Sequence, residues 1–566
     1  MQDRGTRKRS QRYQLRPDRA LLAIAGVVAI AVLCLTAFVP VYTDEINYKQ
    51  FDARLLIDGH TQGLLQCTEP AYLPAPVTQL PARLLFSAAY GNFDAPVVVR
   101  LGGELVFLLL VACLAGCILA SVAEVTSGPA SKTHAGHPSP DARIITLAAT
   151  LFLCVGVGVV PFMATNNRPE QLLLLTAAAA LLIVRASTAG RLADRASWPV
   201  FAVALVLAEL GLSAHAKGML LVPIYLVLAW TIRSRLWRGA YVALLGAMVV
   251  DSFVFNARRW SFAHCPLLHD EFRSRSMLQP AVLFSDPKFF LARISRNALD
   301  APFLLAKTRI AGVYMSGWLP SHDLAAPARA LQYSIIAIAI LTLFAGLVAG
   351  TRVLARHAVS QRTRWDLSDS MSAAITVSLL AIALLQQQRN AYDAGFLYGL
   401  LGIAFVAFLP TVFSLFSATR LRQFARMGVV MGIVSCAQLL WVFAPAVADG
   451  RWLSGSAIPG QPSSVAVVGM HAERPAIVSA AAKCGIRPGD GSRRLLLDDA
   501  AYTVFWPAQE VLPVVNLVQW GRDVPDLAGY LRRVHSSGGV MLCDAVPLAL
   551  QTTARPTGRY CCLPAY

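Results

Sequence analysis

The sequence predicts an α-helical membrane protein that crosses the bilayer about eleven times. Of its 566 residues, 56% are hydrophobic and only 14% are charged, which is far from the composition of a soluble domain. Apolar runs of about 20 residues, the length that spans a bilayer, recur along most of the chain. Its Lys and Arg residues lie in short clusters between these runs, which indicates membrane topology and excludes the single basic face of a nucleic-acid-binding protein.

The apolar runs define the predicted spans. The first follows a basic segment, residues 1–19, and is too long for a signal peptide, so we interpret it as an uncleaved anchor. The predicted spans lie near residues 20–40, 97–122, 143–163, 171–185, 198–213, 218–232, 239–255, 331–350, 371–388, 395–416 and 427–446.

The positive charges predict the orientation of the chain. If the N-terminus is cytoplasmic, the inner segments carry 22 Lys or Arg residues, whereas the three short outer loops carry one each: Arg168, Lys217 and Arg389. Because short cytoplasmic loops are enriched in positive residues, we expect a multi-pass protein of the cytoplasmic (inner) membrane with a cytoplasmic N-terminus. Its transmembrane domain would be residues 20–446.

This orientation places three large segments outside: residues 41–96, 256–330 and 447–566. The first two each predict an interfacial helix, one from Thr43 and one starting at Ser285-Asp286-Pro287, a capping residue followed by proline. The tail has short apolar runs at 465–468, 495–497 and 540–542, and helical patterns near 474–484 and 526–535, which predict a small extracytoplasmic α/β domain.

The eleven cysteines divide between the outer segments and the spans. An oxidising compartment would permit disulfides among the outer six, with the pairing left open; these are Cys67, Cys265, Cys484, Cys543, Cys561 and Cys562. The other five are most simply small apolar core residues; these are Cys34, Cys113, Cys117, Cys154 and Cys436.

Asp44 and Glu45 follow the first span directly and are the candidate catalytic residues. One carboxylate could accept a proton from an attacking hydroxyl while the other orients an acceptor group or a cation. They could hold a divalent cation, but no complete ligand set is visible, and no cofactor is firmly implied. Alternatively, two acids in a first helical turn merely complement the helix dipole.

Each short outer loop places one cation near the same plane as these carboxylates. Arg168 lies between Asn167 and Pro169-Glu170 at a helix start, where an anion is favoured. Lys217 follows His215 between two apolar runs, and Arg389 precedes Tyr392. Cations facing carboxylates at a lipid–water boundary suit a phosphate on a lipid chain together with a hydroxyl nucleophile. For Arg168 and Lys217 the alternative is contact with lipid headgroups.

Two further groups are weaker candidates. The segment from His264-Cys265 to His269 contains metal-binding residue types, but its spacing matches no closed zinc pattern. Glu209 and Asp251 fall near or within spans, where a carboxylate is costly unless paired, so each is either a functional residue or half of a buried structural pair.

The order and common sidedness of these motifs resemble the GT-C membrane glycosyltransferases, the class of the protein O-mannosyltransferases and the aminoarabinose transferases, and in particular the bacterial group with an Asp-Glu first loop. The motifs are Tyr42 to Glu45, Asn167 to Leu175, Lys217 to Pro223 and the segment from Arg389 to Pro410. This chain departs from the commonest pattern in carrying Glu170 where many relatives have Asp, and in separating Arg389 from Tyr392.

The resemblance implies inverting transfer of a sugar from a polyprenyl-phosphate carrier to an acceptor hydroxyl of a lipid, glycan or protein at the outer membrane face. It implies Asp44 as general base and Glu45 as its supporting carboxylate. Lys217, Arg168 and Arg389 with Tyr392 would bind the departing phosphate, with Asn167, Glu170 and His215 in support. A transporter or lipid flippase, and a scaffold that binds a partner through its tail, are the competing functions; the sugar and the acceptor stay open.

Overall fold

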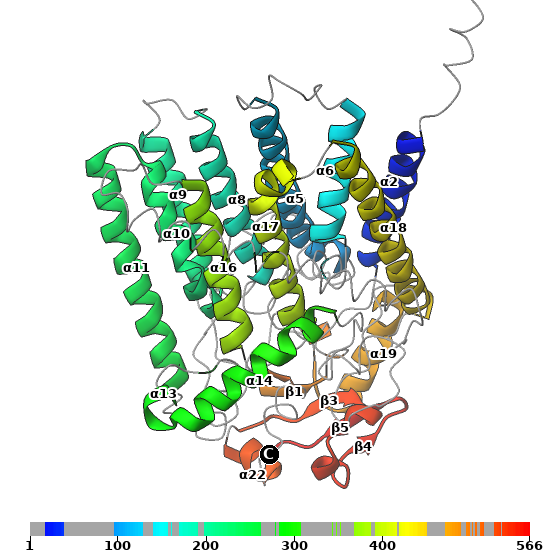
Figure 1. Ribbon diagram of the computed structural model, residues 1–566. Coiled ribbons are helices and arrows are strands. Elements are labelled where there is room, and N and C mark those ends of the chain that lie inside the picture. The colour runs from blue at the N-terminus through cyan, green and yellow to red at the C-terminus, as the bar shows by residue number, and fades with distance from the viewer. Residues whose placement is uncertain are drawn as a thin grey trace, which may run out of the picture.

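The structure is a computed structural model. It describes residues 17–38, 96–127, 140–156, 169–190, 197–261, 282–306, 367–386, 391–415, 418–449, 470–487, 494–498, 510–513, 526–533 and 535–566, with isolated positions between them. Within these residues, a bundle of helices stands above a small sheet domain (Figure 1). The predicted class, a polytopic helical membrane protein with a C-terminal α/β unit, is confirmed.

Seven of the described helices are long and apolar enough to cross a membrane. They are α2 (Pro17–Thr36), α5 (Pro96–Ser127), α8 (Pro169–Thr188), α9 (Ser197–Ala214), α11 (Arg235–Ser261), α16 (Leu367–Leu385) and α18 (Ala418–Asp449).

Three further segments of the same bundle contain shorter apolar stretches, at Arg143–Val155, Lys217–Thr231 and Gly395–Pro410. They are α6 (Pro140–Val155), α17 (Ala391–Leu415) and the run formed by η3 (Ala216–Leu221), α10 (Val222–Leu228) and η4 (Ala229–Thr231). Ten predicted spans therefore correspond to described helices. The span predicted near 331–350 falls outside the described ranges except for isolated positions.

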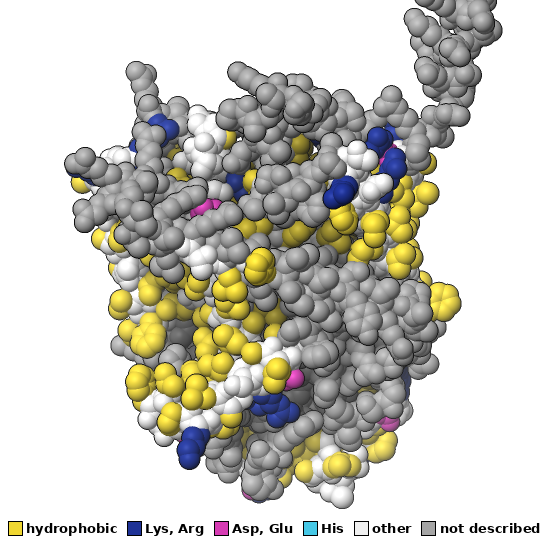
Figure 2. Space-filling model, in the orientation of Figure 1, with side chains coloured by type: hydrophobic (Ala, Val, Ile, Leu, Met, Phe, Trp, Pro, Cys, Tyr) yellow, Lys and Arg dark blue, Asp and Glu magenta, His cyan; other side chains and the backbone are white. Residues whose placement is uncertain are grey.

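The described residues of the bundle form two hydrophobic cores. The larger joins α5, α8, α9, α10, α11, α16 and α17, and includes the fully buried side chains of Phe396 and Tyr225. The smaller joins α2, α6 and α18 around Val429. Large apolar side chains also remain on the outside, among them Val27 and Phe253. On the face in Figure 2 they cover the middle of the bundle, with Lys and Arg above and below. Such a surface is suited to lipid rather than water.

The first and last helices of the bundle are joined by charge. Asp18 in the first turn of α2 is almost fully buried and accepts hydrogen bonds from Arg422 and Arg426 of α18. The Nε atoms lie 2.9 Å (Arg422) and 2.6 Å (Arg426) from its carboxylate oxygens. This contact lies at the opposite end of the bundle from the sheet domain (Figure 1).

A surface helix lies across the lower end of the bundle in Figure 1. It is α14 (Pro287–Ala306), preceded by one turn, α13 (Val282–Ser285). Asp286 caps it, because its Oδ1 accepts from Phe289 N at 3.0 Å. Asn297 Nδ2 donates to Leu384 O at 2.7 Å, which attaches the helix to the end of α16. The predicted start at Ser285-Asp286-Pro287 is confirmed; the interfacial helix predicted from Thr43 lies outside the described residues.

The described residues of the tail form a mixed five-stranded sheet in the order β2-β1-β3-β5-β4, with β1 parallel to β2 and β3, and β5 antiparallel to β3 and β4. Asp498 follows β1, and its side chain connects the end of this strand to β3. It accepts from Ala501 N at 2.8 Å and from Leu542 N of β3 at 2.7 Å. The elements are α19 (Met470–Lys483), β1 (Arg494–Leu497), β2 (Glu510–Pro513), α22 (Leu527–Arg533), β3 (Gly539–Leu542), β4 (Arg555–Pro556) and β5 (Tyr560–Leu563).

Two disulfides hold β5 in this domain: Cys484–Cys562 and Cys543–Cys561. They resolve the pairing of four outer cysteines, whereas Cys67 and Cys265 lie outside the described residues. Among the span cysteines, Cys117, Cys154 and Cys436 are buried as predicted. Cys34 is exposed, so its predicted core position is wrong; it lies on α2, whose described contacts are mainly with α18 and α6.

Candidate functional site

The candidate site forms where α8 begins. Proline at the first position fits because the first amides of a helix have no intrahelical acceptor. Glu170 and Gln171 follow Pro169, and both are buried although they are polar. Two consecutive buried polar side chains at the start of an apolar span are costly unless they have partners.

Lys217 lies in η3, the turn that connects α9 to α10. His215 is the N-cap residue, and its Nδ1 accepts from Lys217 N at 3.0 Å. The adjacent Gly218 allows η3 to touch the end of α9, since a Cβ at Gly218 would lie 1.9 Å from Gly211 O. A cap and a glycine contact therefore position Lys217, whose backbone amide donates to the His215 side chain.

The structure brings Lys217 and Glu170 together. Lys217 Nζ donates to Glu170 Oε1 at 2.9 Å, and the side chains are 9% and 1% exposed. The ammonium also lies 5.8 Å from the ring centroid of Phe396 on α17, within range of a cation–π contact. A buried ion pair is not a strong source of stability, because desolvating both charges offsets most of their attraction. Its position at a helix end is therefore informative about function.

Buried hydroxyl groups of α8, α10 and α11 hold the neighbouring helices together. Tyr225 Oη on α10 lies 2.8 Å from Thr176 Oγ1 on α8, and Tyr241 Oη donates to Tyr225 O at 2.8 Å. These contacts connect α8, α10 and α11 close to η3. The geometry fixes the Lys217 ammonium beside the Glu170 carboxylate. An anion that competes with Glu170 could bind to this ammonium.

Several predicted site residues fall outside this description. Asp44, Glu45, Asn167, Arg168 and Arg389 are not among the described residues. Tyr392 is the second residue of α17, and only its backbone is described. The structure thus connects Glu170, Lys217 and His215, and leaves the other predicted roles as predictions. Within the described part of the chain, no group of three His, Cys, Asp or Glu residues could hold a metal ion.

Neither a protein-family model nor a curated protein matches this chain. A solved structure is similar to it. This is the crystal structure of ArnT from Cupriavidus metallidurans bound to undecaprenyl phosphate, with a TM-score of 0.43 and 11% sequence identity. The similarity covers 96% of this chain and 97% of that chain.

Sequence reasoning missed Phe396 and Gln171. Phe396 lies in a continuously apolar helix and carries no local signal. Gln171 was visible only as a second polar residue before Leu172 to Leu175, and a polar side chain at the start of an apolar run is the signal that could have identified it.

Glu209 and Asp251 do not form a buried pair. Both side chains are exposed on the outside of the bundle, on α9 and α11. The prediction of a buried structural pair is therefore wrong.

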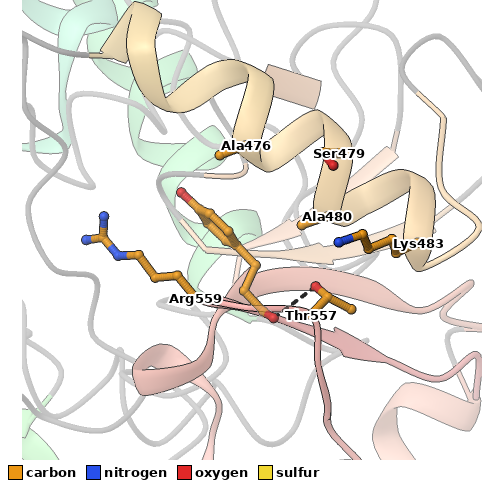
Figure 3. A pocket seen from close by; sticks show the side chains of 7 residues that line it. Ala476, Ser479, Ala480, Lys483, Thr557 and Arg559 are labelled. Carbon is orange, nitrogen blue, oxygen red and sulfur yellow. Dashed lines mark hydrogen bonds between the residues drawn. The ribbon is translucent and has the colours of Figure 1, made fainter.

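The tail domain contains a separate cavity of about 370 Å³ between α19 and the β4–β5 hairpin (Figure 3). Lys483 extends between the helix and the hairpin, whereas Arg559 extends away from Lys483. The two cations do not converge on one point, so the cavity shows no arrangement that selects a particular anion. Its lining residues are Ala476, Ser479, Ala480, Lys483, Thr557, Arg559 and Tyr560.

Proposed function

We propose that this protein is a membrane glycosyltransferase that moves a sugar from a polyprenyl-phosphate carrier to an acceptor hydroxyl at the outer membrane face. The observation that carries the proposal is the buried Lys217–Glu170 pair at the end of the membrane helices. A charged residue buried within membrane helices is expensive and is retained mainly for function. A phosphate on a lipid chain matches it, because the chain lies in the bilayer while the phosphate meets the ammonium.

The proposed reaction is a single displacement. A carboxylate of Asp44 accepts the proton of the acceptor hydroxyl, whose oxygen attacks the anomeric carbon of the sugar. The bond from that carbon to the phosphate oxygen breaks, and the polyprenyl phosphate leaves with the bonding electrons. Attack opposite the leaving group inverts the anomeric centre. Glu45 supports Asp44, and Arg168 and Arg389 with Tyr392 add contacts to the phosphate.

Lys217 stabilises the leaving group in this scheme. Negative charge grows on the phosphate as the glycosidic bond breaks, and a fixed cation in a dry site opposes that charge more strongly than it would in water. Glu170 holds the ammonium in place before the donor arrives. Asn167 and His215 maintain the two turns that carry Arg168 and Lys217.

Transport is not favoured by the structure. The two intramembrane carboxylates that would motivate it, Glu209 and Asp251, are exposed on the outside of the bundle. A transporter would instead direct such groups into a central path between its helices.

The experiment that tests the proposal measures transfer of radiolabelled sugar by protein in lipid nanodiscs. Donors are a panel of polyprenyl-phosphate sugars, and cell-envelope extract supplies the acceptor. We expect wild-type transfer, no measurable transfer by Asp44→Asn, and a loss of about 10²–10³-fold in Lys217→Gln.

Asp251→Asn is the matched control, since it removes a membrane carboxylate from the outside of the bundle and should keep wild-type activity. Full activity of Asp44→Asn would remove the catalytic assignment. Absence of transfer with every donor, from folded wild-type protein, would overturn the proposed function.

A further inference from the structure

Gln171 is a buried amide without a hydrogen-bond partner. The residue is 3% exposed, and neither its Nε2 nor its Oε1 is hydrogen-bonded within the part of the chain that the structure describes. Buried side-chain amides nearly always have partners, and leaving one unpaired costs free energy comparable to several ordinary hydrogen bonds. An unpaired amide at this place therefore calls for a reason.

The packing of α8 against α17 places this amide. Gln171 and Leu174 lie three residues apart and share one face of α8. Leu174 contacts α17 so closely that a Cβ at Gly399 would lie 2.5 Å from its Cδ1. At the other end of the same helix, Arg185 Nη2 donates to Ala407 O at 2.6 Å. The later residue of α8 contacts the later residue of α17 in these two contacts, so the two helices are parallel.

This register places Gln171 at the depth of the Lys217 site. Gln171 precedes Leu174 by three residues, just as Phe396 precedes Gly399 by three residues. In parallel helices both steps rise by about 4.5 Å toward the same end. The ring of Phe396 is the one that lies beneath the Lys217 ammonium. The unpaired amide and the ion pair thus occupy one level of the bundle, at the start of α8.

We propose that Gln171 is a further binding residue for the head group of the lipid-linked donor, its Nε2 donating a hydrogen bond to a phosphoryl oxygen. The inference rests on the proposed function and adds a neutral donor to the cations of the site. The described helices offer Gln171 no hydrogen-bond partner, and the bound phosphate would supply an acceptor. The amide oxygen remains open to a sugar hydroxyl of the same donor.

A substitution of Gln171 should change donor binding without lowering the stability of the empty protein. Replacing Gln171 with Leu keeps the volume and removes both unsatisfied atoms, so the empty protein should unfold at the same or a higher temperature. The same change removes the proposed contact with the phosphate. A hydrogen bond to a charged group corresponds to roughly a tenfold to hundredfold change in Kd.

The test uses full-length protein in nanodiscs, with farnesyl phosphate as the probe and farnesol as the uncharged comparison. We expect Gln171→Leu to bind farnesyl phosphate at least about tenfold more weakly than wild type, with unchanged farnesol binding and no fall in Tm. Ser370→Ala is the matched control, because its Oγ is also buried and unpaired but lies near the start of α16, at the other end of the bundle. It should leave Kd unchanged.

The outcomes distinguish the inference from the proposed function. If Lys217→Gln weakens farnesyl phosphate binding and Gln171→Leu does not, the inference is overturned and the proposed function stands. A fall in Tm for Gln171→Leu would show that the amide has a structural partner, such as a buried water, and would also overturn the inference. Wild-type protein that does not distinguish farnesyl phosphate from farnesol would overturn both.

Discussion

Lys217 and Glu170, 47 residues apart in the sequence, form an ion pair with 2.9 Å between Nζ and Oε1, and both side chains are buried. Lys217 lies in a turn of six residues, whereas Glu170 lies in the first turn of a membrane helix. The pair therefore couples the η3 turn to the start of α8. It makes the position of the ammonium dependent on the packing of both elements.

Separating the two charges should reveal their different roles. Glu170→Gln removes the carboxylate that lies 2.9 Å from the buried ammonium, and we expect the free energy of unfolding to fall by about 3–5 kcal/mol. The double variant Lys217→Met with Glu170→Leu removes both charges and should recover wild-type stability or exceed it. Thermal unfolding in nanodiscs measures both effects.

The double variant should nevertheless show no sugar transfer, because the cation that opposes the phosphate charge is absent. A stable double variant that retains transfer would show that the pair is only structural. A double variant that is as unstable as Glu170→Gln would contradict the energetic account of the pair.

Gly218 should tolerate no side chain. A Cβ there would lie 1.9 Å from Gly211 O, and a backbone atom cannot rotate aside as a side chain can. We expect Gly218→Ala to push η3 away from α9, to lower Tm, and to reduce transfer more than tenfold by displacing Lys217. Gly239→Ala is the control, because nothing lies within 4 Å of a Cβ at Gly239. Equal activity in the two variants would refute the positioning role of this contact.

The two disulfides should contribute unequally to the tail domain. Cys484–Cys562 closes a sequence separation of 78 residues and Cys543–Cys561 one of 18. Chain-entropy estimates are about 4.5 kcal/mol for the longer loop and about 3 kcal/mol for the shorter. Hydrogen exchange of the β5 amides should therefore accelerate more in Cys484→Ser with Cys562→Ser than in Cys543→Ser with Cys561→Ser. The reverse order would show that loop length does not determine their contribution.

The membrane helices were predictable because a span has a strong local signal. Apolar runs predicted ten of the described helices, and the Asp286-Pro287 pair predicted the start of α14. Lys217 and Glu170 were each recognisable as charges beside apolar runs. Their pairing was not, because it depends on how η3 packs against α8, and hydrophobicity along the chain contains no information about that packing.

The tail sheet shows the same limit. The runs at 495–497 and 540–542 predicted β1 and β3, but the β4–β5 hairpin was missed. Its strands are short, and Pro556 interrupts one of them. The useful signal was Gly558, whose φ of 96° allows the turn between them. The exposure of Cys34, Glu209 and Asp251 was also not predictable, because the direction that each face of a helix takes depends on the neighbouring helices.

The contact between Asp18 and its two arginines also constrains the order in which the helices assemble during synthesis. The partners of this carboxylate are 404 and 408 residues further along the chain. At roughly 5–20 residues per second, a ribosome adds them about 20 to 80 seconds after Asp18. The charge contact of α2 can therefore form only after α18 has been made, although α2 also packs against α6, which is synthesised much earlier. A chain that stops before α18 lacks Arg422 and Arg426, so its Asp18 carboxylate cannot form the hydrogen bonds that it forms in the full-length chain.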